Sequence, residues 1–374
     1  MEERKLSKSL LGKSNFLELD VQSKMQSNPD LQMHVEYFRS CLHGNLPPPY
    51  ASLDTNRMTL VHFCVHALDL LNASDVIEKD SVKDWVYSLQ ILPSSSLDEE
   101  GVEDWGKYGF RGGTCMGIPF DPSGESSGAR NSPYDQGHIA MTYTALCTLI
   151  ALGDTSLSKV NRDAVVNSLR HLQQPSGSYA SLADGSECDM RFLYCACAIS
   201  RILNNWEGVN KEKALQYIRS CHNYDGAFGL NPGQESHGGS TFCAVASIYL
   251  MGLLDSFFDG YSRESLIQWC LNRQLEGFQG RPNKMEDTCY SFWVGGTLGL
   301  LGALDFVEKD LVTSFVLKCQ SNQTGGFSKM ENQLPDVLHS FYSVCWLSIA
   351  KTVGTAELDL SLQMCRKHIE PTAS

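Results

Sequence analysis

Four segments of this 374-residue chain repeat one pattern at nearly constant spacing. In each segment a helical stretch ends near Gln or Asn, a turn with glycine follows, and a polar stretch leads into an apolar helix. Aligned on Gly177, Gly226, Gly277 and Gly326, the intervals are 49, 51 and 49 residues. A fifth, degenerate copy covers residues 85–150. A period near 50 residues with two helices per unit predicts helix pairs that stack side by side, because one pair cannot bury its own apolar face.

The helices within each unit differ in composition. The second helix is mostly apolar, as expected of a helix packed on several sides, and the first is amphipathic and charged, as in 211–222. The fold class we predict is therefore all-α, an α/α barrel of helix pairs with the glycine turns gathered at one rim. The predicted inner helices are 189–203, 239–254, 287–304 and 336–350.

One domain is expected. Residues 1–30 are polar without clear periodicity and are predicted to be poorly ordered. Residues 31–365 form the single α/α-barrel domain, and residues 366–374 are a C-terminal tail. Two stretches, 93–109 and 119–137, are predicted to be surface loops, since the second in particular is rich in Pro, Gly and Ser.

Composition and charge exclude several classes of function. A formal net charge of -13 argues against a surface built for nucleic acid or anionic lipid. No apolar run is long enough to span a membrane, and the N-terminus has no secretory signal, so a cytoplasmic protein is expected. Many of the 14 cysteines lie in apolar helical segments, which favours buried free thiols over disulfides.

Because equivalent positions of each unit lie at the same rim, polar residues ten to fourteen after each turn glycine should converge. Asp287 and Cys289 in the third unit and His339 in the fourth offer a carboxylate, a thiolate and an imidazole. This donor set suits zinc with a fourth position open. Taken alone, Asp-x-Cys fits better with a helix-capping aspartate followed by a buried cysteine, and His339 fits an ordinary surface histidine.

A second group of rim residues is basic in a protein that is acidic as a whole. His237, Arg281, Lys284 and Lys329 predict a site for a polyanion such as a diphosphate. Tyr290 follows the proposed ligand Cys289 and could donate a hydrogen bond to a leaving oxygen. The alternative is a scatter of solvated charges.

The inner helices also carry aromatic and small residues that could line an apolar interior. Core packing explains each of them individually, and only the barrel makes a lipid site plausible. They are Phe63, Phe192, Tyr194, Phe242, Cys243, Trp293, Phe341 and Tyr342.

Several stretches resemble the β-subunits of protein prenyltransferases, most closely those of the type I geranylgeranyl enzymes. The most specific is GRPNK followed by DTCYSFW, and others are GFRGG, PYDQGHIAMTYT, ESHGGSTFC and PDVLH. The resemblance runs from about residue 50 to residue 350. It implies one zinc ion bound by Asp287, Cys289 and His339, and a diphosphate held by His237, Arg281, Lys284 and Tyr290.

Further positions are carried over by the same resemblance. Arg191, Tyr194, Cys243 and Trp293 match positions that line the isoprenoid channel. Phe192 and Leu338 match positions that contact the last residue of the protein substrate, where leucine is preferred.

Two positions, Thr59 and Lys329, separate the subfamilies. Thr59 stands where farnesyltransferases close the channel with tryptophan, and Phe63 fits the same type I pattern. Lys329 replaces an aspartate that recruits magnesium, so magnesium should be dispensable. The sequence departs from the pattern at Met285 and Glu286, where a carboxylate beside the zinc ligands would alter metal affinity.

The resemblance thus predicts a zinc-dependent transferase that moves geranylgeranyl from its diphosphate to the cysteine of C-terminal CaaX motifs, with X preferably Leu. It implies a heterodimer with an α-subunit, and CaaX-terminated proteins such as small GTPases as substrates. The alternatives are a farnesyltransferase or Rab geranylgeranyltransferase β-subunit. A terpene cyclase would need a DxDD or DDxxD motif, which we do not find, and a non-enzymatic helical-repeat scaffold would need no zinc.

Overall fold

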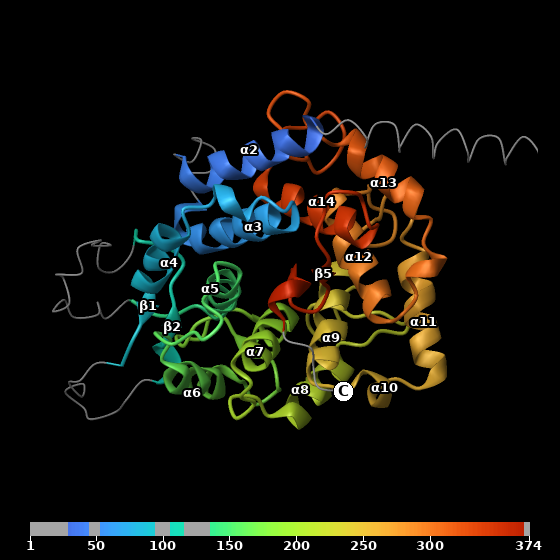
Figure 1. Ribbon diagram of the computed structural model, residues 1–374. Helices are drawn as coiled ribbons and strands as arrows, with labels where there is room; N and C mark the ends of the chain where they lie inside the picture. The colour runs from blue at the N-terminus through green and yellow to red at the C-terminus, as the bar shows by residue number, and fades with distance from the viewer. Residues whose placement is uncertain (1–28, 45–52, 94–104, 116–134, 370–374) are drawn as a thin grey trace, which may run out of the picture.

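Two concentric rings of helices make up the structure, a computed structural model that describes residues 29–44, 53–93, 105–115 and 135–369 (Figure 1). The inner ring consists of α3 (Arg57–Leu70), α5 (Ile139–Ala151), α7 (Met190–Leu203), α9 (Gly238–Leu250), α12 (Thr288–Leu300) and α14 (Val337–Ile349). The outer ring consists of α2 (Pro29–His43), α4 (Lys79–Ser88), α6 (Arg162–Leu172), α8 (Lys211–Ser220), α11 (Gly260–Leu271) and α13 (Lys309–Lys318).

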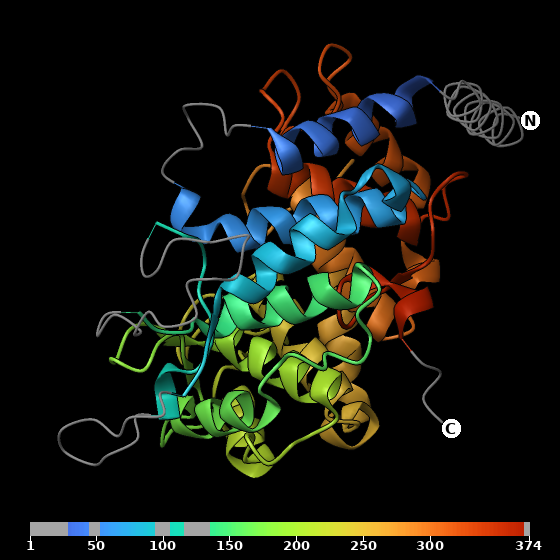
Figure 2. The ribbon, with the colours of Figure 1, turned by 60° about the vertical axis from the view of Figure 1, so that its left-hand side comes forward.

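The inner ring is closed. Each inner helix packs on the next in chain order, and α14 packs on α3, so that the last unit contacts the first. The side view shows the inner helices stacked beside one another (Figure 2). The predicted all-α barrel of helix pairs is confirmed, and the predicted inner and outer helices begin and end within a few residues of those observed.

The turn glycines explain why the units repeat. A Cβ on Gly177 would lie 2.0 Å from the backbone oxygen of Lys213 in α8, and one on Gly226 would lie 2.4 Å from Ser265 in α11. Gly277 is pressed in the same way against Phe315 of α13. Each turn is therefore seated on the outer helix of the following unit. Gly326 meets α2, the first outer helix, which closes the outer ring as well.

Inner helices begin at one rim of the barrel with side-chain caps, which satisfy backbone N–H groups that have no partner within the helix. A polar side chain just before each of α5, α7, α9, α12 and α14 accepts a hydrogen bond from the first turn of its helix. These capping residues are His138, Asp189, His237, Asp287 and Asp336. The positive ends of the helix dipoles therefore gather at this rim, which we call the N-terminal rim.

Short strands, one short α-helix and short 3₁₀ helices complete the described structure; the 3₁₀ helices include η2 (Ser74–Val76), η3 (Trp105–Lys107), η4 (Leu304–Phe306) and η5 (Arg366–His368). The strand pairs are β1 (Gln90–Ile91) with β2 (Gly109–Phe110), β3 (Tyr179–Ala180) with β4 (Cys188–Asp189), and β5 (Leu358–Asp359) with β6 (Met364–Cys365), all antiparallel. The short helix α10 (Leu254–Phe257) follows α9. The β5–β6 hairpin lies at the centre of the ring in Figure 1.

The chain ends predicted from the sequence are only partly described. Residues 1–28 and 370–374, and most of the predicted loops 93–109 and 119–137, lie outside the described residues. The first part of the predicted tail is described and is held against α3, because Lys367 and His368 both bind the buried Asp69 carboxylate.

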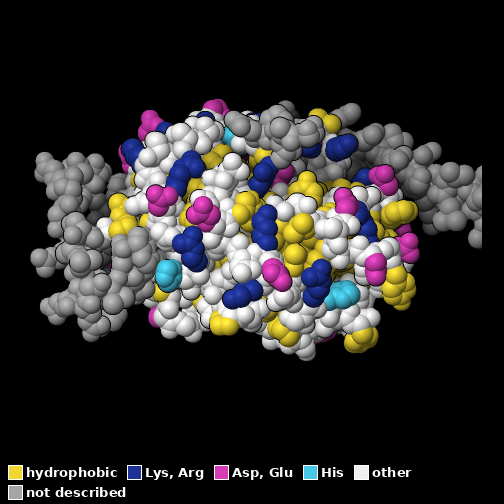
Figure 3. Space-filling view, turned by 90° about the horizontal axis from the view of Figure 1, so that it is seen from below, with side chains coloured by type: hydrophobic (Ala, Val, Ile, Leu, Met, Phe, Trp, Pro, Cys, Tyr) yellow, Lys and Arg dark blue, Asp and Glu magenta, His cyan; other side chains and the backbone are white. Residues whose placement is uncertain are grey.

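The surface and the thiols agree with the composition. All fourteen cysteines are free. Among the described residues, no helix is both long and apolar enough to cross a membrane. On the face seen from below Figure 1, basic, acidic and apolar side chains are intermingled (Figure 3).

Candidate functional site

The candidate site lies where α12 and α14 begin at the N-terminal rim. Asp287 caps α12, and one of its oxygens accepts a hydrogen bond from the Cys289 backbone N–H at 2.9 Å. The glycine turn of the fourth unit lies directly beside the start of α12, because the Thr288 N–H donates to the Lys329 carbonyl at 3.0 Å. The cap and this contact bring Asp287, Cys289 and Lys329 together although they come from different units.

Asp287, Cys289 and His339 form the cluster that the sequence predicted. Their carboxylate, thiol and imidazole donor atoms all lie within 4.8 Å of one another. His339 Nε2 lies 3.2 Å from Asp287 Oδ1. Asp287 and Cys289 are buried and His339 is half-buried, so the cluster is partly shielded from water.

Asp336 orients the imidazole of His339. Its Oδ2 lies 2.6 Å from His339 Nδ1, and its Oδ1 caps α14 by accepting from the His339 N–H. Burial disfavours the charged imidazole, but the hydrogen bonds to Asp287 and Asp336 outweigh burial and raise the pKa of His339 to about 9. A carboxylate on Nδ1 leaves Nε2 as the nitrogen directed at the cluster, as in many metal-binding histidines.

The cluster has the chemistry of a metal site. Burial and the neighbouring Asp287 carboxylate raise the pKa of Cys289, so without a cation the thiol keeps its proton. A bound cation reverses this preference, because it stabilises the thiolate. One sulfur, one carboxylate oxygen and one imidazole nitrogen fit a divalent metal ion with a position left open.

His237 and Tyr290 form a hydrogen-bonded pair next to the cluster. His237 Nδ1 accepts from the Gly239 N–H at 3.0 Å while capping α9. Burial and nearby Arg281 lower the pKa of His237, so the ring is neutral and its proton is on Nε2. Nε2 lies 2.9 Å from the Tyr290 hydroxyl and donates to it. Burial raises the pKa of Tyr290, which therefore keeps its proton and can donate it to an anion at the rim.

The predicted basic residues differ in their contacts and exposure. Arg281 binds Glu235 with 2.7 Å between Nη1 and Oε2. Lys329 Nζ is 3.7 Å from Asp287 Oδ2, and half of its side chain is exposed. Lys284 is exposed on the same turn as Arg281. Arg281 and Lys329 therefore each begin from an ion pair with a carboxylate.

A closed circuit of aromatic side chains runs around the inside of the inner ring, below the N-terminal rim. Consecutive ring centroids lie 4.4 to 5.8 Å apart, and the circuit touches every inner helix described. We call this circuit the aromatic belt. Its members are His62 and Phe63 of α3, Tyr143 of α5, Tyr194 of α7, Phe242 of α9, Trp293 of α12 and Tyr342 of α14.

The remaining predicted site residues lie near the belt or the rim. Thr59 is one turn before Phe63 and donates to Met141 Sδ at 3.3 Å. Cys243 is buried beside Phe242 on α9. Arg191 lies over the ring of Phe192 at 5.1 Å and binds Asp189. Leu338 is exposed at the start of α14.

Two residues of the site were not predicted from the sequence. Glu235 forms the ion pair with Arg281. It precedes His237 by two residues and belongs to no metal or basic pattern. Tyr143 completes the belt from the degenerate copy, where the repeat is hardest to align. The Glu286 carboxylate accepts from the Gly277 N–H at 2.8 Å within the turn, and its effect on metal affinity stays a prediction.

Comparisons with known proteins identify the family of the chain. A sequence model for the prenyltransferase α-α toroid domain matches residues 30–366. The geranylgeranyl transferase type-1 β-subunit of Arabidopsis thaliana is 40% identical over 347 residues, covering 90% of this chain and 89% of the relative. The chain belongs to the prenyltransferase family, among the type-1 geranylgeranyl transferase β-subunits.

Two further matches bear on this assignment. The type-1 β-subunit of Dictyostelium discoideum is 41% identical over 338 residues, covering 89% of this chain and 94% of the relative. The structure of Candida albicans protein geranylgeranyltransferase-I complexed with GGPP matches with a TM-score of 0.77 at 23% identity, covering 90% of this chain and 96% of that chain, and supports the fold. The resemblance of this prenyltransferase chain to type I β-subunits is therefore confirmed.

Proposed function

We propose that this prenyltransferase chain carries one zinc ion on Asp287, Cys289 and His339 and transfers geranylgeranyl from its diphosphate to a protein cysteine. The observation that carries the proposal is the position of this metal-binding cluster. It lies beside the His237–Tyr290 pair, among basic side chains, at the rim above the aromatic belt. A thiol, a diphosphate and an apolar chain could thus meet at one place.

The reaction would form a carbon–sulfur bond and break a carbon–oxygen bond. When bound, zinc supplies a Lewis acid that stabilises the acceptor cysteine as a thiolate. Sulfur attacks the first carbon of the geranylgeranyl group, and diphosphate leaves with the electron pair of the broken bond. The proton of the thiol has already gone to solvent.

The basic residues act on the leaving group. Tyr290, fixed by His237, donates a hydrogen bond to a diphosphate oxygen, while Arg281, Lys284 and Lys329 offset the charge that develops there. Fixed donors of this kind typically contribute roughly a hundredfold or more to the rate. Lys329 would supply charge that a magnesium ion supplies elsewhere, so we propose that magnesium is not required.

The belt and its neighbours would hold the lipid. Thr59, Phe63, Arg191, Tyr194, Cys243 and Trp293 are proposed to line the isoprenoid site. Phe192 and Leu338 are proposed to contact the last residue of a CaaX motif, preferably Leu. We also propose that residues 31–365 act as one barrel domain, that the chain works in the cytoplasm, and that its partner is a prenyltransferase α-subunit.

Co-expression tests the proposal. The chain alone and the chain with a prenyltransferase α-subunit are each given geranylgeranyl diphosphate and a peptide ending in a CaaX motif with Leu. We expect the heterodimer, but not the isolated chain, to add one geranylgeranyl group to the peptide, detected by mass spectrometry. No transfer by either preparation would refute the proposal, and equal transfer by both would refute the need for the α-subunit.

Removing the Glu235 carboxylate, which forms an ion pair with Arg281, should tighten diphosphate binding. Glu235 competes for the guanidinium and repels an incoming anion, and an exposed ion pair of this kind is worth up to about 1 kcal/mol. Glu235→Gln is expected to lower the Kd of the heterodimer for inorganic pyrophosphate roughly fivefold, measured by calorimetry.

Glu276→Gln is the matched control. It breaks a similarly exposed pair, Glu276 with Lys318 on α13, at the same change in net charge. It should leave the Kd within about twofold of wild type. Weaker binding by Glu235→Gln would show instead that Glu235 holds Arg281 in position.

A further inference from the structure

The β5–β6 hairpin enters the barrel from the end opposite the metal-binding cluster. Its anchors lie at the C-terminal ends of the inner helices: the Ser348 hydroxyl accepts from the Leu358 N–H, and the Leu70 carbonyl accepts from the Ala356 N–H. The tip of the hairpin, residues 360–363, reaches the aromatic belt. Tyr143 donates its hydroxyl to the Leu362 carbonyl at 2.8 Å, and Tyr194 donates to the Ser361 carbonyl at 2.9 Å.

Gln363 spans the interior between opposite walls. Its Nε2 donates to the Tyr194 hydroxyl of α7 at 3.0 Å, and its Oε1 accepts from the Tyr342 hydroxyl of α14 at 3.2 Å. Going around the ring either way, two inner helices separate α7 from α14, so these helices face each other. Both side-chain ends of the buried Gln363 are thus hydrogen-bonded across the barrel at the level of the belt.

The conformation of the tip is fixed locally. One oxygen of Asp359 accepts from the Ser361 and Leu362 N–H groups, which forms a tight turn. Gln363 itself has a φ of 58°, a left-handed conformation that costs free energy unless its surroundings hold it. The hydrogen bonds to Tyr194 and Tyr342 provide such surroundings.

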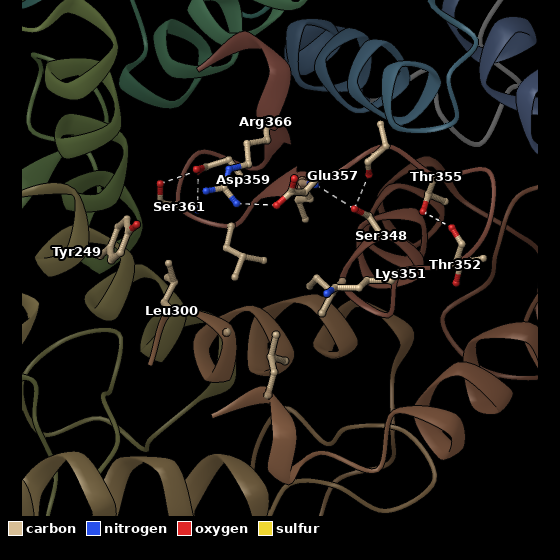
Figure 4. Close-up of a pocket in the computed structure, with 16 residues that line it drawn as sticks. Tyr249, Leu300, Ser348, Lys351, Thr352, Thr355, Glu357, Asp359, Ser361 and Arg366 are labelled. Carbon is tan, nitrogen blue, oxygen red and sulfur yellow. Dashed lines mark hydrogen bonds and ion pairs between the residues drawn. The ribbon is translucent and has the colours of Figure 1, made fainter. Parts of the chain in front are cut away.

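Below the tip, the hairpin is held both by polar contacts and by its buried apolar side chains, among them Leu358, Met364 and Cys365. Figure 4 shows the Arg366–Glu357 pair and the Ser348 contacts beside a cavity of about 550 Å³. A second cavity of about 460 Å³ is also lined by Asp359, Ser361 and Arg366. Beyond the hairpin, Asp69 of α3 fastens Lys367 and His368. The tip is therefore fixed at both ends although space remains beside it.

We infer that Gln363 is a specificity-determining residue that forms the floor of the lipid site and limits how long an isoprenoid chain can be. The inference rests on the proposed function. Side chains from opposite walls meet on Gln363, so a chain that enters from the N-terminal rim ends at this level. Each added isoprene unit must then fit above a fixed floor.

Binding of three diphosphates tests the inference: farnesyl, geranylgeranyl and the next longer homologue, geranylfarnesyl. The heterodimer is titrated with each, without peptide. Gln363→Ala removes the crossing side chain and is expected to raise the affinity for geranylfarnesyl relative to geranylgeranyl diphosphate about tenfold or more, as for other pockets that gain room for a few carbons.

Gln363→Leu separates bulk from hydrogen bonding. It keeps most of the side-chain volume without polar atoms, so the ratio of affinities should stay within about threefold of wild type. Thermal unfolding of each variant shows whether it is folded. If folded Gln363→Ala leaves the ratio unchanged, Gln363 is not the floor.

An equal shift in Gln363→Ala and Gln363→Leu would also overturn the inference, because a loosened hairpin would explain both. The proposed function fails separately. If the wild-type heterodimer binds none of the three diphosphates, the lipid site itself is wrong. If wild type transfers geranylgeranyl and only the ratio fails to move, the inference alone is lost.

Discussion

Cys289→Ala and Asp287→Asn are each expected to remove zinc from the heterodimer and to lower kcat/KM for geranylgeranyl transfer by well over a hundredfold. Each removes one of three donor groups that lie within 4.8 Å of one another. A metal ion contributes several kcal/mol of stabilisation to such a reaction, so losing it costs orders of magnitude in rate. Zinc content is measured by atomic absorption alongside the transfer rate.

The choice of variants separates metal binding from folding. Asn caps helices as well as Asp, so Asp287→Asn keeps the start of α12 while removing the charge. Cys270→Ala removes another buried thiol, from α11 and away from the site, and should retain one zinc and full activity. Folded Cys289→Ala protein with one tightly bound zinc would disprove the ligand assignment.

Gly177→Ala is expected to cost about 3 kcal/mol or more in the free energy of unfolding. Gly177 has a φ of 94°, which disfavours any side chain, and a Cβ there would lie 2.0 Å from the Lys213 carbonyl oxygen. The backbone conformation and the collision each cost on the order of 1–3 kcal/mol. Because the turn is seated on α8, the change separates two adjacent units of the barrel.

Gly153→Ala measures the backbone cost alone. Gly153 has the same φ of 94°, but no atom lies within 4 Å of the Cβ it would gain. We expect it to lose about 1 kcal/mol, so that the difference between the variants in chemical denaturation reports the contact with α8. Equal losses would mean that the glycine is needed for its conformation and not for close packing of the units.

The repeat made the barrel predictable. Its period set the number of helices per unit, and the apolar second helix of each unit predicted α7, α9, α12 and α14 before any contact was known. The closing contact between α14 and α3 was less accessible. It depends on α3, which precedes every copy of the repeat, and α3 in turn packs on α5 of the degenerate copy, where the glycine spacing is lost.

The site was predictable where chemistry coincided with repeat position. Asp287 and His339 lie at the same rim of the barrel because each is at the start of an inner helix. Their convergence therefore follows from the period of the repeat. Glu235 and Gln363 were not predictable. Glu235 occupies Arg281 through a contact between two units, and Gln363 lies after the last repeat, where no periodic signal says that the chain turns back into the barrel.

The measurement to make on the wild-type heterodimer is a competition between two isoprenoid diphosphates and between two acceptor peptides. Farnesyl and geranylgeranyl diphosphates are supplied together with peptides ending in Leu or Ser, with zinc present and magnesium either omitted or added. The assignment predicts that geranylgeranyl on the Leu peptide dominates and that magnesium changes the rate little. Preferential farnesyl transfer, or transfer that requires magnesium, would contradict the roles given to Thr59 and Lys329.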